Sequence, residues 1–140
     1  MGSCIFCKII KGTEKSWIIH KDDKVTAFLD AYPVTEGHVL VAFNKHVDNL
    51  FKLSDEEFLH MMRIARKISL KMKNKLGAQF VNIITAESVI NHAFIHVIPR
   101  SDYDLMGIVP DMENKRTMSN DVMETLYKKL CGGKIAKRKI

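Results

Sequence analysis

The sequence predicts an α+β domain, in which one long amphipathic helix covers an antiparallel sheet of about five strands. Three observations lead to this fold class. Short apolar segments bounded by Gly, Pro, Asn or Asp fill residues 17–43 and 78–98, a pattern typical of strands. The segment between them repeats its apolar residues with the period of a helix. Strands come first, then the long helix, then strands again, and this order favours an antiparallel sheet.

The first strands are predicted in WIIHKDDKVTAFLD, as two short segments around a turn at Asp22-Asp23. The next stretch, AYPVTEGHVLVAF, is a loop marked by Pro and Gly that leads into a strand from Gly37 to Phe43. Two more strands are predicted in AQFVNIIT and HAFIHVI, joined as a hairpin through AESVI. Pro99 is expected to end the last strand, because proline cannot donate a hydrogen bond to a neighbouring strand.

The long helix is predicted to begin at Ser54, which with Glu57 has the pattern of a capping box. Gly77 is well placed to end it. A second, short helix is predicted from about Ser119 to Leu130. The apolar side of the long helix needs a flat apolar surface to cover it, which the sheet supplies. This side consists of Phe58, Met61, Met62, Ala65, Ile68, Met72 and Leu76.

The chain of 140 residues is predicted to form a single domain over residues 1–130, followed by a basic, flexible tail over 131–140. It contains no internal repeat and no linker that would divide it. No apolar run approaches the roughly 20 residues that span a bilayer, and the first residues lack a secretory pattern. We therefore expect a cytoplasmic or nuclear protein that does not contact a membrane.

The net charge of +6 is concentrated in the tail, CGGKIAKRKI, which contains four cations and no acid. The rest of the chain carries only about +2. A solvated tail is the simpler interpretation, and a localisation signal or a contact with an anionic partner is the alternative. Nucleic acid is not expected as a partner, except for weak contact through the tail.

Three cysteines in a chain without a secretory pattern argue against a disulfide scaffold. Cys4 and Cys7 form a Cys-x-x-Cys pair, whereas Cys131 stands alone. In a reducing compartment such a pair indicates half of a metal site or a redox pair. Zinc accepts two thiolates at this spacing, but a structural zinc site needs four ligands.

The stretch AESVINHAFIHVIPR contains His92, Phe94 and His96 at even spacing. In a strand these three side chains project from one face, and Ala93 and Ile95 project from the other. Two histidines in such a row favour a functional site. On this stretch alone, partly buried and hydrogen-bonded histidines are the equally weighted alternative.

Three stretches, CIFCKIIKG, AFLDAYPVTEGHVLVAFNKH and HVIPR, resemble the histidine triad (HIT) family in their order and spacing, over about residues 4 to 100. The resemblance implies the family's α+β fold, usually as a homodimer whose sheets join. It also implies purine nucleotide binding, with transfer or hydrolysis of nucleotidyl groups from adenosine phosphoramidates or dinucleoside polyphosphates. The family's signature is His-φ-His-φ-His-φ-φ, in which φ is apolar and the middle histidine is the nucleophile.

By this resemblance His92 and His96 match the first and last histidines, and Phe94 occupies the position of the nucleophile. A benzyl side chain has neither a lone pair nor an exchangeable proton, so it cannot attack phosphorus. His38 matches a further histidine near the triad.

The segment that holds the transferred phosphate in the family, Gly-Gln-Ser, is matched here by Glu87, Ser88 and Val89. Glu87 would place a negative charge near an anion. Because several parts of the site differ at once, we interpret the change as a natural loss of the chemistry. A single engineered substitution would leave the remaining parts intact.

The resemblance further implies a base pocket between the first helical stretch and the second and third strands. Asp30 matches the acid that accepts hydrogen bonds from the ribose hydroxyls. The apolar positions equally suit a small core, so their presence alone does not establish binding. With His96, the residues expected to bind a nucleotide are Ile5, Phe6, Ile9, Phe28, Leu29, Asp30 and Leu40.

Some members of the family complete a zinc site with the histidine of a Lys-His pair and with the first triad histidine. Here these residues are His46 and His92. The resemblance therefore implies a structural Cys2His2 zinc site formed by Cys4, Cys7, His46 and His92. The alternative is two buried, reduced cysteines beside two unrelated histidines.

Three functions follow from these observations. The first is a HIT-like purine nucleotide-binding protein that is catalytically impaired or inactive. The second is a residual hydrolase of nucleoside phosphoramidates or dinucleoside polyphosphates that uses His96 or His38 as its nucleophile or general base. The third is a homodimeric interaction scaffold held together by zinc. We rank the first and the third above the second.

Overall fold

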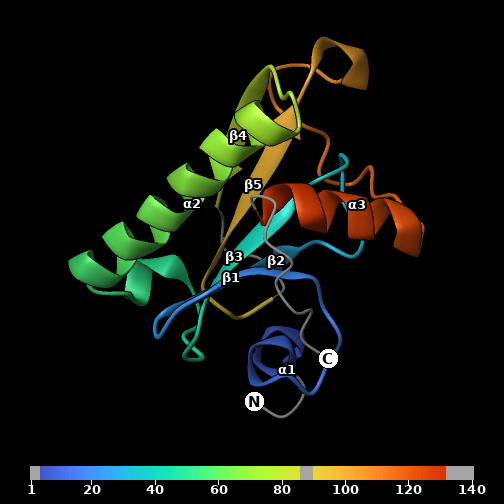
Figure 1. The fold of residues 1–140 in the computed structure, drawn as a ribbon. Coiled ribbons are helices and arrows are strands. Elements are labelled where there is room, and N and C mark those ends of the chain that lie inside the picture. Colours follow the sequence, from blue (N-terminus) through green and yellow to red (C-terminus); the bar gives the residue numbers. More distant parts are fainter. Residues whose placement is uncertain (1–3, 86–89, 132–140) are drawn as a thin grey trace.

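One antiparallel sheet forms the centre of the computed structural model, which describes residues 4–85 and 90–131 (Figure 1). The order of its strands is β1-β2-β3-β5-β4. Each strand is antiparallel to its neighbours, so the predicted sheet is confirmed. The strands are β1 (Ile18–Lys21), β2 (Val25–Leu29), β3 (Val39–Phe43), β4 (Phe80–Ile84) and β5 (Phe94–Arg100).

Helices lie on both faces of this sheet (Figure 1). Two of them, α2 (Asp55–Lys75) and α3 (Asn120–Leu130), cover one face, and α1 (Ile5–Lys11) lies against the other. Two short 3-10 turns, η1 (Leu50–Lys52) and η2 (Asp102–Asp104), complete the described elements. None of the described helices is long and apolar enough to cross a membrane.

The start of α2 has the predicted capping box. The Ser54 hydroxyl accepts a hydrogen bond from the Glu57 amide at 3.2 Å, and the Glu57 carboxylate accepts one from the Ser54 amide at 2.9 Å. Gly77 follows the helix with φ +68°, a left-handed conformation that glycine adopts without strain. The buried side of the helix consists of Met61, Ile64, Ala65, Ile68 and Met72.

The central strands β2 and β3 are buried on both faces. Alternate side chains of these strands belong to two separate apolar clusters, because successive side chains of a strand point to opposite faces. Val25, Ala27 and Leu29 join the large core with α2 and α3. The smaller cluster under α1 consists of Phe6, Ile9, Ile18, Phe28, Leu40, Ala42 and Phe94, and both candidate sites border it.

The prediction that Pro99 ends the last strand is wrong, since β5 continues to Arg100. The pairing of β5 with β3 ends at Val97, whereas its pairing with β4 continues, with Pro99 opposite Val81. Pro99 therefore lies where only one neighbouring strand remains, a position at which proline is tolerated.

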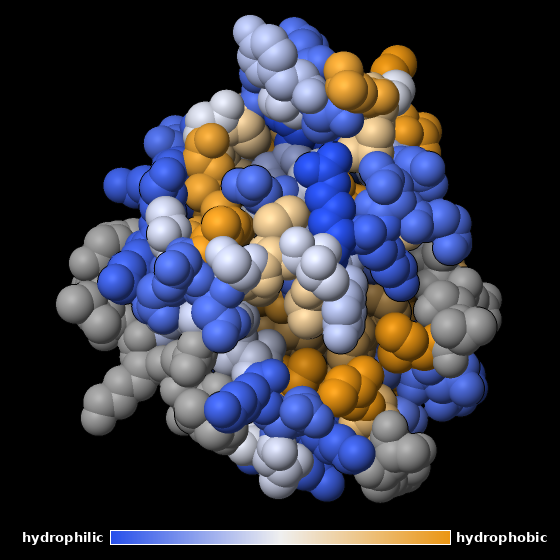
Figure 2. Space-filling view, turned by 90° about the vertical axis from the view of Figure 1, so that its right-hand side faces the viewer, coloured by the Kyte–Doolittle hydropathy of each residue, from blue (hydrophilic) through white to orange (hydrophobic). Residues whose placement is uncertain are grey.

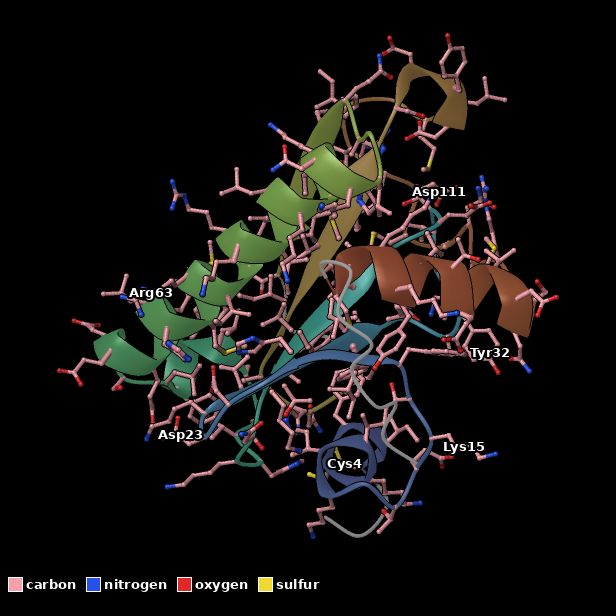
Figure 3. The ribbon with its side chains drawn as sticks, in the orientation of Figure 1. Cys4, Lys15, Asp23, Tyr32, Arg63 and Asp111 are labelled. Carbon is pink, nitrogen blue, oxygen red and sulfur yellow. The ribbon has the colours of Figure 1, made fainter. Side chains whose placement is uncertain are left out.

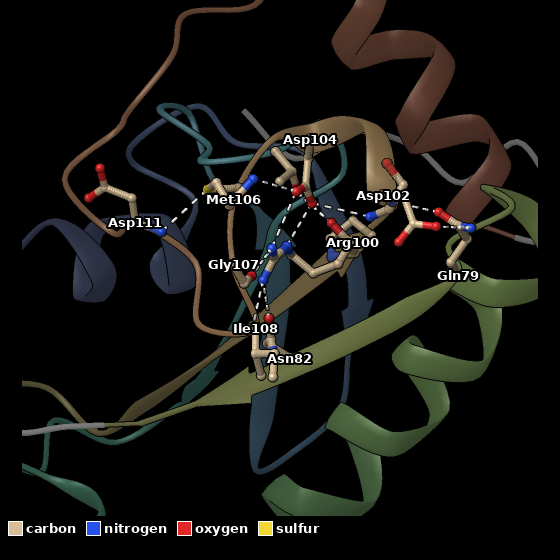
Figure 4. A network of polar contacts seen from close by, with 12 residues as sticks. Gln79, Asn82, Arg100, Asp102, Asp104, Met106, Gly107, Ile108 and Asp111 are labelled. Carbon is tan, nitrogen blue, oxygen red and sulfur yellow. Dashed lines mark hydrogen bonds and ion pairs between the residues drawn. The ribbon is translucent and has the colours of Figure 1, made fainter.

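Arg100, buried at the end of β5, holds the segment that follows it (Figure 4). Its guanidinium donates hydrogen bonds to the Asp104 carboxylate at 2.6 Å, to Asn82 Oδ1 at 2.7 Å and to the Gly107 and Ile108 carbonyls. This contact lowers the pKa of Asp104 to about 2. The ion pair fixes the path of the chain as it turns back toward the sheet.

Candidate metal and nucleotide sites

The side of β5 that faces α1 presents the predicted row of His92, Phe94 and His96. The ring centroids of Phe94 and His96 are 4.9 Å apart, and His92 lies just before the strand. Ala93 and Ile95 belong to the core on the opposite face. The period-2 assignment of these side chains is therefore confirmed.

Phe94 is an integral part of the small apolar cluster under α1. Its ring meets Phe6 edge to face, with centroids 4.9 Å apart and an interplanar angle of 84°, a favourable arrangement for aromatic pairs. Only 7% of Phe94 is exposed. The phenyl ring is thus held within this apolar cluster.

Cys4, Cys7, His46 and His92 form a group that could hold a metal ion, with one ligand atom from each within 4.8 Å of the others. Cys4 caps α1, where its sulfur accepts a hydrogen bond from the Cys7 amide. This places both sulfurs at the start of the helix, and Figure 3 shows Cys4 below the sheet. His46 follows β3 and His92 precedes β5, so three separate parts of the chain meet at this point.

The distances within this group match tetrahedral coordination. A zinc ion with ordinary Zn–N and Zn–S bonds separates two nitrogens by about 3.3 Å and a nitrogen from a sulfur by about 3.6 Å. The Nδ1 atoms of His46 and His92 are 3.3 Å apart. Sulfur-to-Nδ1 distances are 3.2 Å between Cys7 and His46, 3.5 Å between Cys4 and His92, and 3.7 Å between Cys7 and His92.

The protonation of His92 also suits a ligand. Its Nε2–H donates a hydrogen bond to the Phe43 carbonyl at 2.7 Å, so Nδ1 carries the lone pair that faces the sulfurs. Metal-binding histidines are commonly oriented by such a bond from the second ring nitrogen. Burial lowers the pKa of His92, which keeps the ring neutral. The four residues therefore fit a metal ion.

Asp30, His38 and His96 form a second polar cluster, at the ends of β2 and β3 and on β5. The backbone N–H of Val34 donates to Nδ1 of His38 at 3.2 Å, so the proton of neutral His38 is on Nε2. His38 Nε2 lies 2.9 Å from His96 Nδ1 and 3.7 Å from an oxygen of Asp30. His38 thus donates to His96, and the proton of neutral His96 is on its Nε2.

Burial keeps both histidines of this cluster neutral. It lowers the pKa of His38 to about 3, with smaller contributions from His96 and Lys115, and the pKa of His96 to about 4, with a contribution from Lys115. Burial also raises the pKa of Asp30, although the Tyr32 amide and Lys115 oppose this shift.

The ligand atoms of this second cluster are close enough for a metal ion, but their protonation does not suit one. A metal on His38 Nε2 would leave the proton of the neutral ring on Nδ1, directly opposite the N–H of Val34. The cluster is instead a chain of hydrogen bonds from Val34 through His38 to His96. Its last donor, Nε2–H of His96, has no hydrogen-bond partner in the part of the chain described.

A cavity of about 440 Å³ lies between α1 and the polar cluster. This volume is within the range of small-molecule sites. Six of the predicted nucleotide-binding or catalytic residues line it, together with Phe94: Ile5, Phe6, Ile9, Asp30, His38 and His96.

The other three predicted residues do not line this cavity. Phe28 and Leu40 lie in the apolar cluster under α1, and Leu29 belongs to the larger core with α2 and α3. Phe28 and Leu29 border a neighbouring cavity of about 510 Å³ between α1, β2 and α3. The two cavities share Ile5, Ile9, Ala31 and Tyr32.

The part of the cavity wall that comes from the segment after β5 was not predicted from the sequence. Met112, Glu113 and Lys115 line the cavity, and the Arg116 amide donates to the Pro33 carbonyl at 2.9 Å, which holds this segment against the loop before β3. No local sequence pattern indicates that the chain after β5 returns to line the cavity. The predicted phosphate-side residues Glu87, Ser88 and Val89 lie outside the described residues.

A five-stranded antiparallel sheet, with His96 on β5 facing a cavity beneath the short helix α1 and His92 just before that strand, has the α+β architecture of HIT proteins. The chain belongs to the HIT family, since the family's HIT domain matches residues 11–103. An adenosine 5′-monophosphoramidase of Candida albicans is 31% identical over 110 residues, which cover 72% of each chain.

Two solved structures are similar over nearly the whole chain. A hypothetical histidine triad nucleotide-binding protein of Sulfolobus tokodaii has a TM-score of 0.81 and 27% identity, covering 93% of this chain and 91% of that one. A zinc-bound histidine triad family protein of Mycobacterium smegmatis has a TM-score of 0.75 and 25% identity, covering 92% and 94%. Their shared architecture is the fold described above.

Proposed function

We propose that this protein binds purine nucleotides at the cavity under α1 and has lost, or nearly lost, the nucleotidyl chemistry of its family. The single observation that carries this proposal is the presence of Phe94 between His92 and His96, beside a cavity lined by Asp30. The printed name of the Sulfolobus tokodaii structure, a nucleotide-binding protein, supports the binding half of the proposal.

The hydrogen-bond chain supports the loss of chemistry. A nucleophilic or basic histidine needs a lone pair aimed at the reacting atom. His38 Nδ1 accepts from Val34, and His96 Nδ1 accepts from His38. The remaining ring nitrogens carry protons, so neither neutral histidine offers a lone pair to a ligand. This arrangement disfavours His96 and His38 as replacement nucleophiles.

Calorimetric titration with adenosine monophosphate tests the binding. We expect saturable binding to the wild-type protein and an affinity about tenfold lower in Asp30→Asn, because a neutral amide is a weaker acceptor for ribose hydroxyls than a carboxylate. Asp23→Asn, an exposed acid at the β1–β2 turn, is the matched control and should bind as the wild type does. No binding to the wild-type protein would refute the proposal.

A residual hydrolase is the second candidate, and the Candida albicans phosphoramidase relative favours it. Its test is mass spectrometry after incubation with an adenosine phosphoramidate. We expect no covalent nucleotidyl adduct. An adduct on His96 or His38 would establish the residual enzyme and refute the loss of chemistry.

We propose zinc as the metal of the Cys4, Cys7, His46 and His92 group, in a structural role. The donor set of two thiolates and two imidazoles suits zinc, and the Mycobacterium smegmatis relative contains zinc. All four positions are taken by protein ligands, so such an ion would have no open position for a substrate. The ion would tie α1 to the loops beside β3 and β5.

We also propose that the protein is a homodimer. β1 and β4 are the edges of the sheet, and an unpaired edge tends to associate with another strand. Ile83 on β4 is 40% exposed. The neighbouring η2 and the segment after it expose Tyr103, Leu105, Ile108 and Val109, and the side of the molecule turned toward the viewer in Figure 2 has apolar surface at its upper end.

A further inference from the structure

We propose that Lys115 binds the phosphate of the nucleotide in the cavity under α1, opposite the N–H of His96. This inference rests on the proposed function, because it assigns the phosphate end of the same ligand. Lys115 lies outside residues 11–103, the part of the chain that matches the family's domain.

The backbone of the segment holds Lys115 at the cavity. The amide of Arg116 donates to the Pro33 carbonyl at 2.9 Å. On the other side of Lys115, the Asn114 amide donates to the Asp111 carbonyl at 3.1 Å and closes a turn. Lys115 is thus carried by a segment fixed on both sides, and it lines the cavity together with His96 and Asp30.

The charge of Lys115 acts on the polar wall of the cavity. It contributes to lowering the pKa of His38 and of His96, and it opposes the rise in the pKa of Asp30, while burial is the first cause in each case. Lys115, Asp30, His38 and His96 line the same cavity, so the ammonium can attract an anion that lies between them. Within the described residues, Lys115 forms no ion pair with a carboxylate.

His96, which lines the same cavity, supplies a second donor. The chain from Val34 through His38 leaves the proton of His96 on Nε2, the atom without a partner among the described residues. An ammonium and an imidazole N–H are both donors, and charge-assisted bonds to phosphate oxygens are among the stronger hydrogen bonds. Neither donor presents a lone pair that could attack phosphorus. The arrangement therefore suits a phosphate that is bound without nucleophilic attack.

Acidic residues oppose this arrangement. Glu113 is exposed and lines the same cavity, so its charge partly offsets that of Lys115. The sequence also has Glu87 in the stretch that matches the family's phosphate-holding segment. A cation from the return segment compensates for these negative charges, and removing Glu113 should strengthen phosphate binding.

Calorimetry with two probes, adenosine and adenosine monophosphate, separates phosphate binding from nucleoside binding on the full-length protein. We expect Lys115→Gln to bind adenosine monophosphate about tenfold more weakly and adenosine unchanged, because one charge-assisted contact is lost. Lys115→Arg should retain most of the affinity, and Glu113→Gln should increase it. Lys73→Gln, which removes the same charge from an exposed position on α2, should behave as the wild type.

The outcomes distinguish this inference from the proposed function. If both probes bind and Lys115→Gln weakens neither, or weakens both equally, the role of Lys115 is refuted and nucleotide binding stands. An equal loss of affinity for adenosine monophosphate in Lys73→Gln would show that the effect comes from the overall charge of the protein. This result would also refute the role of Lys115. If neither probe binds the wild-type protein, both proposals fail.

Discussion

At residue 94 a phenyl ring stands between two histidines that already have other partners. His92 uses Nε2–H on the Phe43 carbonyl and turns Nδ1 toward Cys4 and Cys7. His96 uses Nδ1 to accept from His38. Each histidine therefore has a local reason to be present without a nucleophile between them. For His96 this reason is the hydrogen-bond chain that starts at Val34.

Phe94→His should not by itself restore full hydrolase activity. The substitution returns an imidazole to the correct face, but losing a single donor to the transferred phosphate can cost about 10²- to 10³-fold in rate, and the matching segment here is Glu87, Ser88 and Val89. The new ring also loses the edge-to-face contact with Phe6. We expect at most trace hydrolysis of an adenosine phosphoramidate in a steady-state assay.

A larger gain should require Glu87→Gly, Ser88→Gln and Val89→Ser in addition to Phe94→His. A turnover of about 1 s⁻¹ or more from the single variant, which is typical of enzymes, would contradict the loss of the phosphate site. Phe94→Leu serves as the control, since it removes the phenyl ring without adding a nucleophile.

The buried histidines predict a specific acid sensitivity. The folded-state pKa of His96 is about 4 and that of His38 is about 3, both below the usual value of about 6.5. The unfolded chain therefore binds more protons at acidic pH, and stability falls as the pH drops from about 6.5 to 4. His96→Gln, whose amide oxygen can still accept from His38, should lose less stability over this interval than the wild-type protein.

Denaturant unfolding of both proteins at pH 7 and pH 5, followed by circular dichroism, measures this difference. Acid also weakens metal binding to histidine and cysteine, but this loss is common to both proteins and cancels in the comparison. Equal losses in the two proteins would show that His96 is not held neutral by the fold.

At the scale of elements, the reliable predictions rest on local rules. The capping box at Ser54, the glycine after α2 and the start of α3 after Ser119 depend on nearest neighbours in the chain, and the structure agrees. The end of β5 depends on which strands lie beside it, and the sequence around Pro99 does not contain that information. Lys115 was missed for the same reason, because only the tertiary fold brings the return segment to the cavity.

The site predictions divide in a similar way. The Cys-x-x-Cys pair and the even spacing of His92 and His96 fix which atoms can face each other, and the family resemblance supplied His46. For Leu29 the resemblance pointed to the nucleotide pocket, whereas the alternation of β2 assigns its side chain to the opposite core. The protonation of His38 depends on its contact with the Val34 amide, and no sequence pattern predicts this contact.

Removal of zinc should destabilise α1 before the rest of the fold. Outside the proposed metal ligands, this helix of seven residues is held mainly by Phe6 and Ile9, and short isolated helices are marginal in water. Metal binding contributes directly to folding when the ligands come from distant segments. We expect a chelator to lower the melting temperature of the wild-type protein, and Cys4→Ser to melt at a lower temperature without chelator.

Elemental analysis of protein purified without chelator should find about one zinc per chain. Cys131→Ser is the matched control, because Cys131 lies at the end of α3, away from the group; its zinc content should equal that of the wild type. Protein that contains no zinc, or a Cys4→Ser variant with an unchanged melting temperature, would refute the structural metal.

At the scale of the whole molecule, the two faces of the sheet differ in what they contain. The face covered by α2 and α3 contains most of the core, whereas the face under α1 contains both candidate sites and the smaller apolar cluster. The metal group lies where α1 meets β3 and the start of β5, and the cavity lies along the other side of the same helix. Loss of the metal should therefore also weaken nucleotide binding, because Ile5, Phe6 and Ile9 form one wall of the cavity.

The last prediction concerns the edge of the sheet. Arg100 binds Asn82 on β4 and the Ile108 carbonyl, so the exposed apolar residues after η2 lie next to the free edge of β4. A second copy that pairs along this edge would cover Ile83 and the apolar segment together.

Sedimentation at micromolar concentration should give a particle of twice the 16.0 kDa chain mass. Ile83→Lys, which places a charge on the edge, should shift the protein toward the monomer, whereas Phe51→Lys on η1 should not. A wild-type particle with the mass of one chain would rule out the dimer.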